Sequence, residues 1–444
     1  MSNSRLVAIT VIEKVLNENA YSNIVLGLEL NKSELNDKDK ALVTEIVYGT
    51  LKYKYTIDKI LQHFVKNGFD KLESFVLNIL RISVYQIRYL DKVPSFAAVN
   101  EAVNLTKKKS NIGASKLVNG VLRSYLREID AKYYNEENDI ERLCFEYSFT
   151  KALVKLFIKQ YGPQKAEEIL KGLNYKPDVT VRVNTLKLTY KEIWEKLIEN
   201  GYNIEEGYAS SEAIRIIKGK NIENNVLFNE GNITVQDESA MLTAPSMDLK
   251  LNMKVLDLCS APGGKTTHIA ELMKNTGKVL AFDVHKNKLS LIEESIKRIG
   301  ITNTTCEVQD ATVFTKDLFE YADRVLIDVP CSGLGIIRKK PEIKWSKNVK
   351  DINNIVDIQR RIMDNASKYV KKGGVLVYST CTLNKDENEG NIDWFIESHS
   401  EFKIEPVFFG EFDNIEYSDK GYVTIFPNEY MDGFFKIGRA SCRE

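Results

Sequence analysis

Between residues 254 and 266 the chain reads Lys254-Val-Leu-Asp-Leu-Cys-Ser-Ala-Pro-Gly-Gly-Lys-Thr266. The apolar residues up to Leu258 predict a short buried strand, and a helix is expected directly after the glycines, over 266–273. Strands and helices then alternate along the chain, with strands at 278–283, 305–308, 324–329 and 374–379 and helices at 288–299 and 351–370. This alternation predicts a doubly wound α/β domain, with a parallel sheet covered on both faces.

The chain before this α/β domain has a different pattern. Residues 1–132 predict an all-helical domain, because apolar residues recur at helical spacing over 5–16, 41–51, 56–64, 75–90, 97–106 and 116–126. Residues 141–236 mix helices with short strands at 180–184 and 213–217, which predicts a small α+β domain. The α/β domain takes 237–435. Residues 436–444 lack the alternation expected of a last strand, so we interpret them as a non-native tail that truncates the sheet.

Composition excludes several classes of protein. The 444 residues are 43% hydrophobic and 28% charged, with 24 Gly and 9 Pro, which fits a globular chain and excludes fibrous ones. No apolar run is long enough for a transmembrane helix, and the N-terminus has no signal-peptide pattern, so we expect a cytoplasmic protein without membrane contact. The six cysteines form no C-x-x-C pair and the four histidines do not join them, so no metal site is expected.

Charge is uneven although the chain as a whole is neutral, with 62 basic and 62 acidic residues. Residues 1–130 contain 19 Lys and Arg against 14 Asp and Glu, a net charge of +5. An excess of positive charge at one end is compatible with a polyanionic partner but is also common on solvated surfaces.

Ligands of a doubly wound sheet bind outside the carboxyl ends of its strands, so the residues just after each strand are candidates. These are Cys259-Ser-Ala-Pro-Gly-Gly-Lys265, Asp283, Asp310, Asp328-Val-Pro-Cys-Ser-Gly333 and Ser379-Thr-Cys-Thr382. The two glycines allow a ligand close to the backbone, and the Asp283 carboxylate suits the two hydroxyls of a ribose. Together they predict a cofactor that contains adenosine.

Three cofactor classes compete for this site. A dinucleotide oxidoreductase would need G-x-G-x-x-G, which the turn lacks. A P-loop NTPase would share Gly264-Lys265-Thr266, but Cys259 stands where its first glycine belongs, and Pro262 removes one backbone N–H from the phosphate cradle. The third class uses S-adenosylmethionine.

The cysteines favour S-adenosylmethionine. Cys331 and Cys381 both follow predicted strands, so they should face one cleft. Carbon 5 of cytosine becomes nucleophilic once a thiolate has added to carbon 6, and elimination of the thiol afterwards restores the ring. Two cysteines beside a nucleoside cofactor suit this covalent mechanism, although the chemistry leaves open which of them attacks.

These motifs resemble the Sun family of RNA cytosine-C5 methyltransferases, in the RsmB (Sun, Fmu) branch that acts on bacterial 16S ribosomal RNA. The resemblance extends to about Phe435. It includes Arg182-Val-Asn184 and Gln236-Asp-Glu-Ser-Ala240, and Ala97-Ala-Val-Asn-Glu-Ala-Val103 and Leu117-Val-Asn-Gly-Val-Leu-Arg123 are similar to the NusB-like RNA-binding domain of that branch. It implies a NusB-like domain, a small α+β domain and a Rossmann-like class I methyltransferase domain.

The same resemblance implies roles for individual residues. Cys381 would be the nucleophile, and Cys331 would assist release of the methylated RNA. Asp328 and Lys265 would lie between the methionine end of S-adenosylmethionine and the target cytosine. The cofactor contacts would be Cys259, Ser260, Ala261, Pro262, Gly263, Gly264, Lys265, Asp283, Asp310 and Asp328.

The target base must leave any helix to reach a cysteine, so we expect 16S RNA that is unfolded or early in assembly, bound by a monomer. The alternatives are another RNA, such as transfer RNA or 23S, and a catalytically silent RNA-binding module. Two further expectations concern single residues. Arg338-Lys-Lys-Pro341 and Lys344-Trp345 would either contact phosphates and stack on bases beside the cleft or form a solvated loop. His268 and His285 would be structural or incidental.

Overall fold

The computed structural model describes residues 3–346, 349–437 and 439–442. The chain forms two compact units, Met1–Asn174 with Ile337–Lys347, and Tyr175–Ile336 with Asn348–Glu444. Within the described ranges, none of the helices combines the length and apolar character that crossing a bilayer requires.

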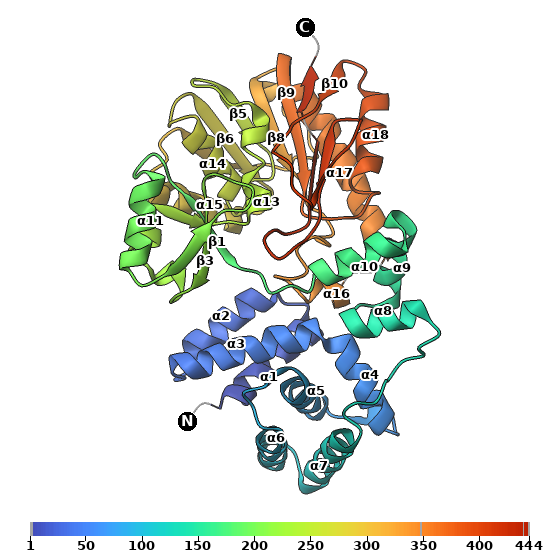
Figure 1. Ribbon diagram of the computed structural model, residues 1–444. Coiled ribbons are helices and arrows are strands. Elements are labelled where there is room, and N and C mark those ends of the chain that lie inside the picture. Colours follow the sequence, from blue (N-terminus) through green and yellow to red (C-terminus); the bar gives the residue numbers. More distant parts are fainter. Residues whose placement is uncertain (1–2, 347–348, 438, 443–444) are drawn as a thin grey trace. The chain divides into compact units, whose positions relative to one another are not determined.

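The first unit contains helices and no strands among its described residues (Figure 1). Its α-helices are α1 (Ser4–Glu18), α2 (Ser22–Lys32), α3 (Asp37–Lys52), α4 (Lys54–Phe64), α5 (Ser74–Tyr89), α6 (Ser95–Lys109), α7 (Ile112–Arg127), α8 (Asp139–Tyr147), α9 (Lys151–Tyr161), α10 (Pro163–Gly172) and α16 (Ile343–Ser346). The six helices predicted before residue 132 are all present, and α2 and α8 are additions to them.

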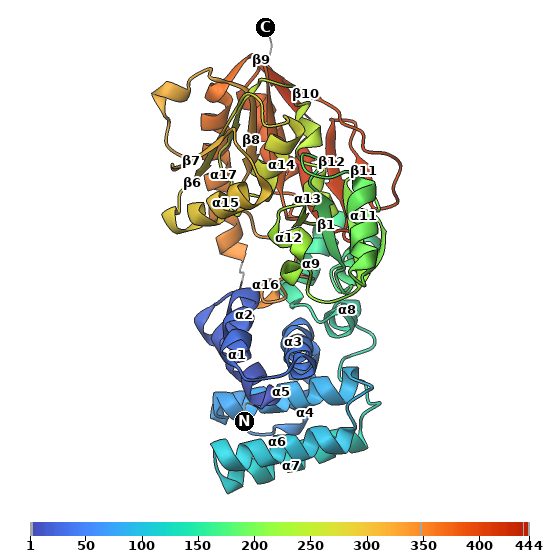
Figure 2. The same cartoon turned by 90° about the vertical axis from the view of Figure 1, so that its left-hand side faces the viewer.

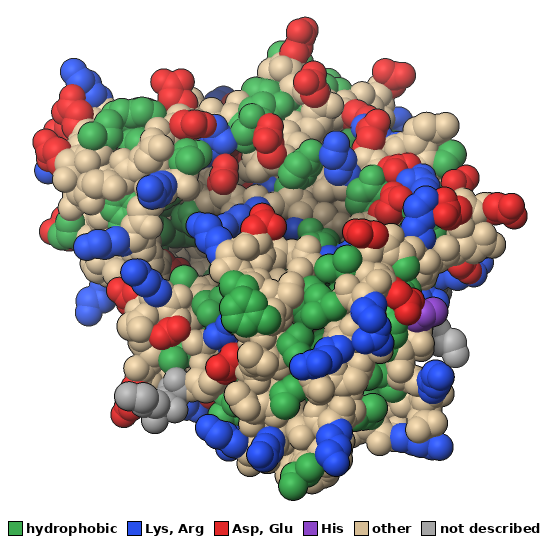
Figure 3. Space-filling model, turned by 60° about the horizontal axis from the view of Figure 1, so that its bottom comes forward, with side chains coloured by type: hydrophobic (Ala, Val, Ile, Leu, Met, Phe, Trp, Pro, Cys, Tyr) green, Lys and Arg blue, Asp and Glu red, His purple; other side chains and the backbone are tan. Residues whose placement is uncertain are grey.

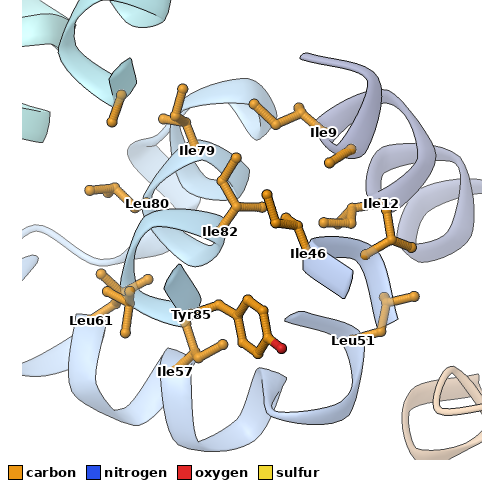
Figure 4. Packing of buried hydrophobic residues seen from close by; sticks show 14 of the residues in the cluster. Ile9, Ile12, Ile46, Leu51, Ile57, Leu61, Ile79, Leu80, Ile82 and Tyr85 are labelled. Carbon is orange, nitrogen blue, oxygen red and sulfur yellow. The ribbon is translucent and has the colours of Figure 1, made fainter. Parts of the chain in front are cut away.

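The core of this unit is almost wholly aliphatic, and it forms where α1, α3, α4 and α5 meet. Figure 4 shows Ile9, Ile46, Ile82 and Tyr85 pointing toward one another from these helices. Packing is close at Gly49, where an added Cβ would come within 1.9 Å of the Tyr85 ring. Helical periodicity in the sequence therefore located the core of this unit correctly.

Helix α2 was missed because its pattern is weak. Only Val25 and Leu26 among its apolar residues are buried, whereas Ile24 and Leu28 remain more than half exposed. A single apolar stripe, which is the signal used for the other helices, is absent from this segment.

Helices α8 to α10 belong to the helical unit, although residues from 141 onward were expected to join the α+β domain. Phe145 of α8 lies in the helical core, and its backbone carbonyl accepts a hydrogen bond of 2.5 Å from the Thr56 hydroxyl. This packing is a long-range contact that sequence periodicity does not reveal.

Lys344 and Trp345 also differ from expectation, because both are held within the helical unit. The Lys344 amine is buried and donates to the carbonyl oxygens of Lys52, Tyr147 and Ser148 at 3.1–3.3 Å. The Trp345 ring N–H donates to the Leu51 carbonyl at 2.9 Å. The prediction that Lys344 contacts phosphate is therefore wrong, since backbone carbonyls already occupy its amine, and burial holds its pKa well below the ordinary value.

Among its described residues, the second unit contains two sheets. The smaller one has four antiparallel strands in the order β2-β3-β1-β4, with α11 (Tyr190–Glu199) against it (Figure 2). Its strands are β1 (Val179–Val183), β2 (Asn203–Glu206), β3 (Ala213–Lys218) and β4 (Ile233–Val235). The short helices α12 (Val226–Asn229) and α13 (Glu238–Met241) lead from it to the larger sheet.

The larger sheet has ten strands, and its parallel part runs β7-β6-β5-β8-β9. These strands are β5 (Lys254–Asp257), β6 (Lys278–Asp283), β7 (Thr304–Val308), β8 (Ala322–Asp328) and β9 (Val370–Thr380). After β7 the chain returns to the other side of β5, so strand order reverses between β5 and β8. A ligand site is expected at the carboxyl ends of those two strands.

Helices cover both faces of this sheet, as predicted. On one face Leu256 and Ile327 pack with Met363 of α17 (Val349–Tyr369) and with α18 (Glu389–Ser398). On the other, Val255 and Leu326 pack with α14 (Gly264–Leu272) and the end of α15 (Lys286–Ile299). The doubly wound α/β class is confirmed by this arrangement.

The chain ends in antiparallel strands that the sequence did not predict. They are β10 (Phe402–Glu405), β11 (Ile415–Tyr417), β12 (Tyr422–Ile425), β13 (Phe434–Ile437) and β14 (Arg439–Cys442). The sheet was expected to end near Phe435, but β14 pairs with β10 and β9, and its Ala440 is fully buried. Residues 438, 443 and 444 of the interpreted tail lie outside the described residues.

Candidate active site

The loop Cys259–Lys265 leaves β5 at the point where strand order reverses. Its Ser260 hydroxyl donates to the Asp257 carbonyl at 2.7 Å, and the Ser260 N–H donates to the Phe282 carbonyl of β6 at 2.9 Å. Gly263 has a φ of 101°, and a Cβ there would lie 3.2 Å from the backbone of Ile292 in α15. The turn thus needs glycine for both its conformation and its close packing.

The side chain of Arg182 holds this loop in place through an ion pair and hydrogen bonds. Its guanidinium is buried, pairs with Glu271 of α14 at 2.8 Å, and donates to the Gly264 carbonyl at 2.9 Å. It also donates to Gln236, the residue that begins the second motif noted in the sequence. The two motifs therefore meet at the first turn of α14, where they fix the loop that precedes it.

Carboxylates gather around this loop. Burial raises the pKa of Asp257 to about 6, against the hydrogen bond of 2.7 Å that it accepts from Thr266. The pKa of the Cys259 thiol is well above its ordinary value because of burial and then of the charges of Asp257, Asp328, Asp283 and Asp310. Such a concentration of negative charge favours a positively charged ligand.

Asp283 and Asp310 stand at the ends of β6 and β7, as predicted. The Asp283 side chain is buried and accepts from the His285 N–H at 2.8 Å. Asp310 is exposed and accepts from both the N–H and the hydroxyl of Thr312, which hold its pKa below the ordinary value. Each carboxylate is thus oriented by residues that follow it in its own loop.

Lys265 and Asp328 form an ion pair across the switch point. The Lys265 amine lies 2.6 Å from Asp328 Oδ2, and the Ser379 hydroxyl donates to Oδ1 at 2.7 Å. Burial lowers the pKa of Lys265, but Asp328 outweighs burial and holds it above the ordinary value. Asp328 is therefore fixed between the helix after β5 and the end of β9.

Cys331 and Cys381 meet as the parallel strands predicted. Their sulfur atoms lie 3.3 Å apart, within reach of an S–H···S hydrogen bond, and both residues are half-buried. The contact with Cys381, together with burial, raises the pKa of Cys331 well above its ordinary value. One sulfur can then donate a proton or a hydrogen bond to the other.

A buried polar cluster behind the two cysteines was missed by the sequence analysis. Its members are Gln359, Thr382, Asn384, Glu387, Asn388 and Asn391, all with fully buried side chains. The available signal was the polar run Asn384-Lys-Asp-Glu-Asn-Glu389 directly after the Cys381 motif, which is unusually polar for a segment that leads into a buried helix.

Of the two histidines considered in the sequence, His268 is buried and His285 is exposed. His268 is buried in α14 and bonds Glu212 at 2.7 Å, while burial lowers its pKa. The His285 backbone N–H bonds Asp283, as described above. Among the described residues, no three or more His, Cys, Asp or Glu side chains are grouped so that they could hold a metal ion.

The arrangement suits the cofactor that the sequence predicts. Asp257 Oδ1 is buried without a hydrogen-bond partner in the described structure, and the charges of four carboxylates act on Cys259. S-adenosylmethionine carries a sulfonium and an ammonium, so its charge complements this group. The residues present therefore fit that cofactor.

Three family models match successive parts of the chain. The model described as 16S rRNA methyltransferase RsmB/F matches residues 244–438, the NusB family model matches 2–127, and the ferredoxin-like domain model of RsmF/B-like methyltransferases matches 149–223. These matches confirm the expected fold class of a NusB-like helical domain, a small α+β domain and a methyltransferase domain.

Individual relatives match over most of their length. "Probable ribosomal RNA small subunit methyltransferase B" of Bacillus subtilis is 40% identical over 90% of this chain and 89% of the relative. "Ribosomal RNA small subunit methyltransferase B" of Proteus mirabilis is 32% identical over 89% of this chain and 92% of the relative. The crystal structure of PH0851 is 28% identical, covers 100% of this chain and 99% of its own, and has a TM-score of 0.83.

Proposed function

The chain belongs to the 16S rRNA methyltransferase RsmB/F family, and we propose that it transfers a methyl group from S-adenosylmethionine to carbon 5 of a cytosine in 16S ribosomal RNA. The observation that carries the proposal is the pair of sulfur atoms 3.3 Å apart at the ends of β8 and β9. One sulfur can attack the base while the other assists, as the covalent route to a methylated carbon 5 requires.

S-adenosylmethionine, when bound, supplies a methyl group on a sulfonium. The residues proposed to hold it are those of the loop Cys259–Lys265 with Asp283, Asp310 and Asp328, all at the carboxyl edge of the sheet. Asp283 would accept from the ribose hydroxyls, and Asp310 would lie by the adenine edge.

Cys381 is the proposed nucleophile. Its thiolate forms a bond to carbon 6 of the cytosine, which moves the electrons of the ring double bond onto carbon 5 and lets that carbon take the methyl group. Transfer of the proton on carbon 5 to a base, here solvent water, then re-forms the double bond and breaks the bond between carbon 6 and sulfur, so that Cys381 leaves as a thiolate.

Cys331 assists the departure of Cys381. Its raised pKa keeps it a thiol at neutral pH, so its S–H can donate to the Cys381 sulfur whenever that sulfur is a thiolate. The same hydrogen bond from the Cys331 S–H can form to the Cys381 thiolate both before attack and after release. Lys265 and Asp328 would lie between the methionine end of the cofactor and the target base, with Asp328 oriented by Ser379.

The helical unit offers a surface for RNA. The last turn of α6 is Lys107-Lys-Lys109, and Lys116, Arg123 and Arg127 recur on the exposed face of α7. Lys and Arg side chains stand along the lower part of the surface in Figure 3, where helices of this unit face the viewer. Such a row suits the phosphates of RNA and carries no sequence preference of its own. In this proposal the enzyme is a cytoplasmic monomer that acts on 16S RNA unfolded or early in assembly.

The test is methyl transfer from labelled S-adenosylmethionine to separate transcripts of 16S, 23S and transfer RNA, followed by nucleoside analysis. We expect label in 5-methylcytidine from 16S RNA. Label in 5-methylcytidine from another RNA would overturn the substrate, label in a different nucleoside would overturn the chemistry, and RNA binding without transfer would indicate a silent binding module.

A further inference from the structure

Glu387 lies behind the two cysteines and connects the segments that carry them. Its side chain is fully buried. Oε2 accepts from the Ser332 N–H at 2.8 Å, one residue after Cys331, and Oε1 accepts from the Asn384 amide at 3.1 Å, three residues after Cys381. One carboxylate thus connects the loop after β8 with the loop after β9.

A third donor reaches the same carboxylate from α17. The Gln359 amide nitrogen donates to Glu387 Oε2 at 3.1 Å and to the Pro330 carbonyl, beside Cys331, at 3.0 Å. Two direct bonds also join the loops, since the Ser332 and Thr382 hydroxyls lie 2.7 Å apart and the Gly335 N–H donates to the Cys381 carbonyl at 2.9 Å. The position of one sulfur is therefore set relative to the other by Glu387 and its neighbours.

The choice of a carboxylate here has a physical reason. All three partners of Glu387 are N–H donors, so the group between them must be an acceptor on both of its oxygens, which an ionised carboxylate is and an amide is not. These donors are neutral, and burying a charge among neutral groups is costly, so mere filling of space would favour an uncharged residue. The negative charge of Glu387 also acts on Cys331, in the direction that keeps its proton on sulfur.

We propose that Glu387 is a positioning residue that holds the Cys331 and Cys381 loops in register, so that the two sulfur atoms stay within hydrogen-bond reach. The proposal rests on the proposed function for its consequence in catalysis, but not for the geometry itself. Glu387 reaches the reaction only through the cysteines, and no contact of its own with RNA or cofactor is needed.

The decisive variants exchange the two ends of one hydrogen bond. Glu387→Gln places an NH₂ group against the Asn384 amide, so two donors face each other, and Asn384→Asp places a second carboxylate against Glu387. The double variant Glu387→Gln with Asn384→Asp restores one donor and one acceptor while keeping the net charge of the pair. Glu389→Gln, two residues along and outside the cluster, is the matched control.

The first readout needs no substrate. Dibromobimane fluoresces strongly once it has bridged two nearby thiols, and peptide mapping locates the bridge. We expect bridging of Cys331 to Cys381 in the wild type and in Glu389→Gln, at least a tenfold slower rate in each single variant at Glu387 or Asn384, and recovery in the double variant. Unchanged bridging in Glu387→Gln, or no recovery in a folded double variant, would overturn the proposal.

The second readout is methyl transfer. Each single variant should lose about 100-fold in kcat, as expected of a misplaced reacting group, with the Kd for S-adenosylmethionine within twofold of wild type, because the cofactor loop lies outside the cluster. The double variant should recover most of the rate. If kcat and cofactor binding fell together in proportion to unfolded protein, and the double variant gave no rescue, a purely structural role would replace the proposal. If the wild type were inactive but its two cysteines still bridged rapidly, the result would count against the proposed function. It would not count against the role of Glu387 in holding the two loops in register.

Discussion

The helical core and the carboxyl edge of the large sheet bury opposite kinds of side chain. Around α1, α3 and α5 the buried residues are mostly Ile, Leu and Val, and the buried amine of Lys344 bonds backbone carbonyls at the ends of α3 and α8. At the sheet edge Lys265 is instead paired with a carboxylate, next to thiols and amides. The same residue type thus has a lowered pKa in one region and a raised pKa in the other.

The different surroundings of Lys344 and Lys265 indicate what each region contributes to the protein. Lys344 among carbonyls completes the hydrogen bonds of helix ends and so supports folding. Lys265 and Asp328 instead form a charge pair at the carboxyl ends of parallel strands, where ligands of such sheets bind. Changes in the helical region should therefore alter stability or RNA affinity, and changes at the sheet edge should alter chemistry.

The largest expected effect is at Cys381. Cys381→Ala should lower the rate of methyl transfer by more than about 1,000-fold, because the covalent route is lost, while the free energy of unfolding changes by less than about 1 kcal/mol. Initial rates and urea unfolding measure the two quantities. Cys306→Ala in β7 is the matched control and should keep full activity. Equal activity in the two variants would show that Cys381 does not carry the chemistry proposed for the sheet edge.

Lys344→Met tests the other side of the comparison. The substitution keeps the apolar stem but leaves carbonyls of Lys52, Tyr147 and Ser148 without their donor, so we expect a loss of about 3 kcal/mol in the free energy of unfolding. The rate per folded molecule should stay within twofold. Lys340→Met, which removes an amine lying over the Tyr21 ring, should cost less than about 1 kcal/mol. A stable Lys344→Met variant would show that this buried amine does not support folding.

The basic face of α7 should affect affinity rather than rate. Arg123→Glu with Arg127→Glu should raise the Kd for 16S RNA roughly tenfold and make the dependence of log Kd on log salt shallower by about 1.4, as expected for two lost phosphate contacts. Filter binding at several salt concentrations measures both. Lys191→Glu with Lys196→Glu makes the same charge change on α11, and an equal loss of affinity there would mean that only net charge matters.

Asp257 should give the smallest effect, and the size of that effect depends on pH. Burial raises its pKa to about 6 in the folded protein, against about 3.9 when unfolded. Between pH 4 and pH 6 the folded state therefore binds more protons, and the contribution of Asp257 to stability falls as the pH rises.

Asp257→Asn removes this dependence. Relative to wild type, the variant should gain about 1 kcal/mol in the free energy of unfolding when the pH is raised from 5 to 7.5, measured by urea titration at both values. The difference between the proteins should be flat above pH 7.5. If the difference in free energy of unfolding between Asp257→Asn and wild type did not change with pH, Asp257 would not be the group that titrates in this range.

The sequence predicted the parts of the molecule that depend on local pattern. Apolar runs located β5, β6, β8 and β9, and because parallel strands end at one edge, the meeting of Cys331 and Cys381 followed from position alone. For Lys265 and Asp328 a shared location was implied only by the family resemblance, and the ion pair between them was not predicted.

The rest depends on contacts between distant segments. Lys344 is close in sequence to the Cys331 motif, yet its partners lie about 170 to 290 residues away, so no local rule could assign it to helix ends. Glu387 looks like one charge in a polar run, and only the fold shows three donors converging on it. Strands such as β12 are short and were hidden for the same reason, since their pairing partners define them.

The most direct test of the proposed chemistry is a trapping experiment on denaturing gels. Wild type, Cys331→Ala and Cys381→Ala would each be incubated with unmodified 16S RNA and S-adenosylmethionine. We expect a covalent protein–RNA adduct to accumulate in Cys331→Ala, because release of the RNA from Cys381 is blocked. We expect no adduct in Cys381→Ala. An adduct in Cys381→Ala and none in Cys331→Ala would reverse the roles of the two cysteines, and methylation by Cys381→Ala without any adduct would contradict the covalent mechanism.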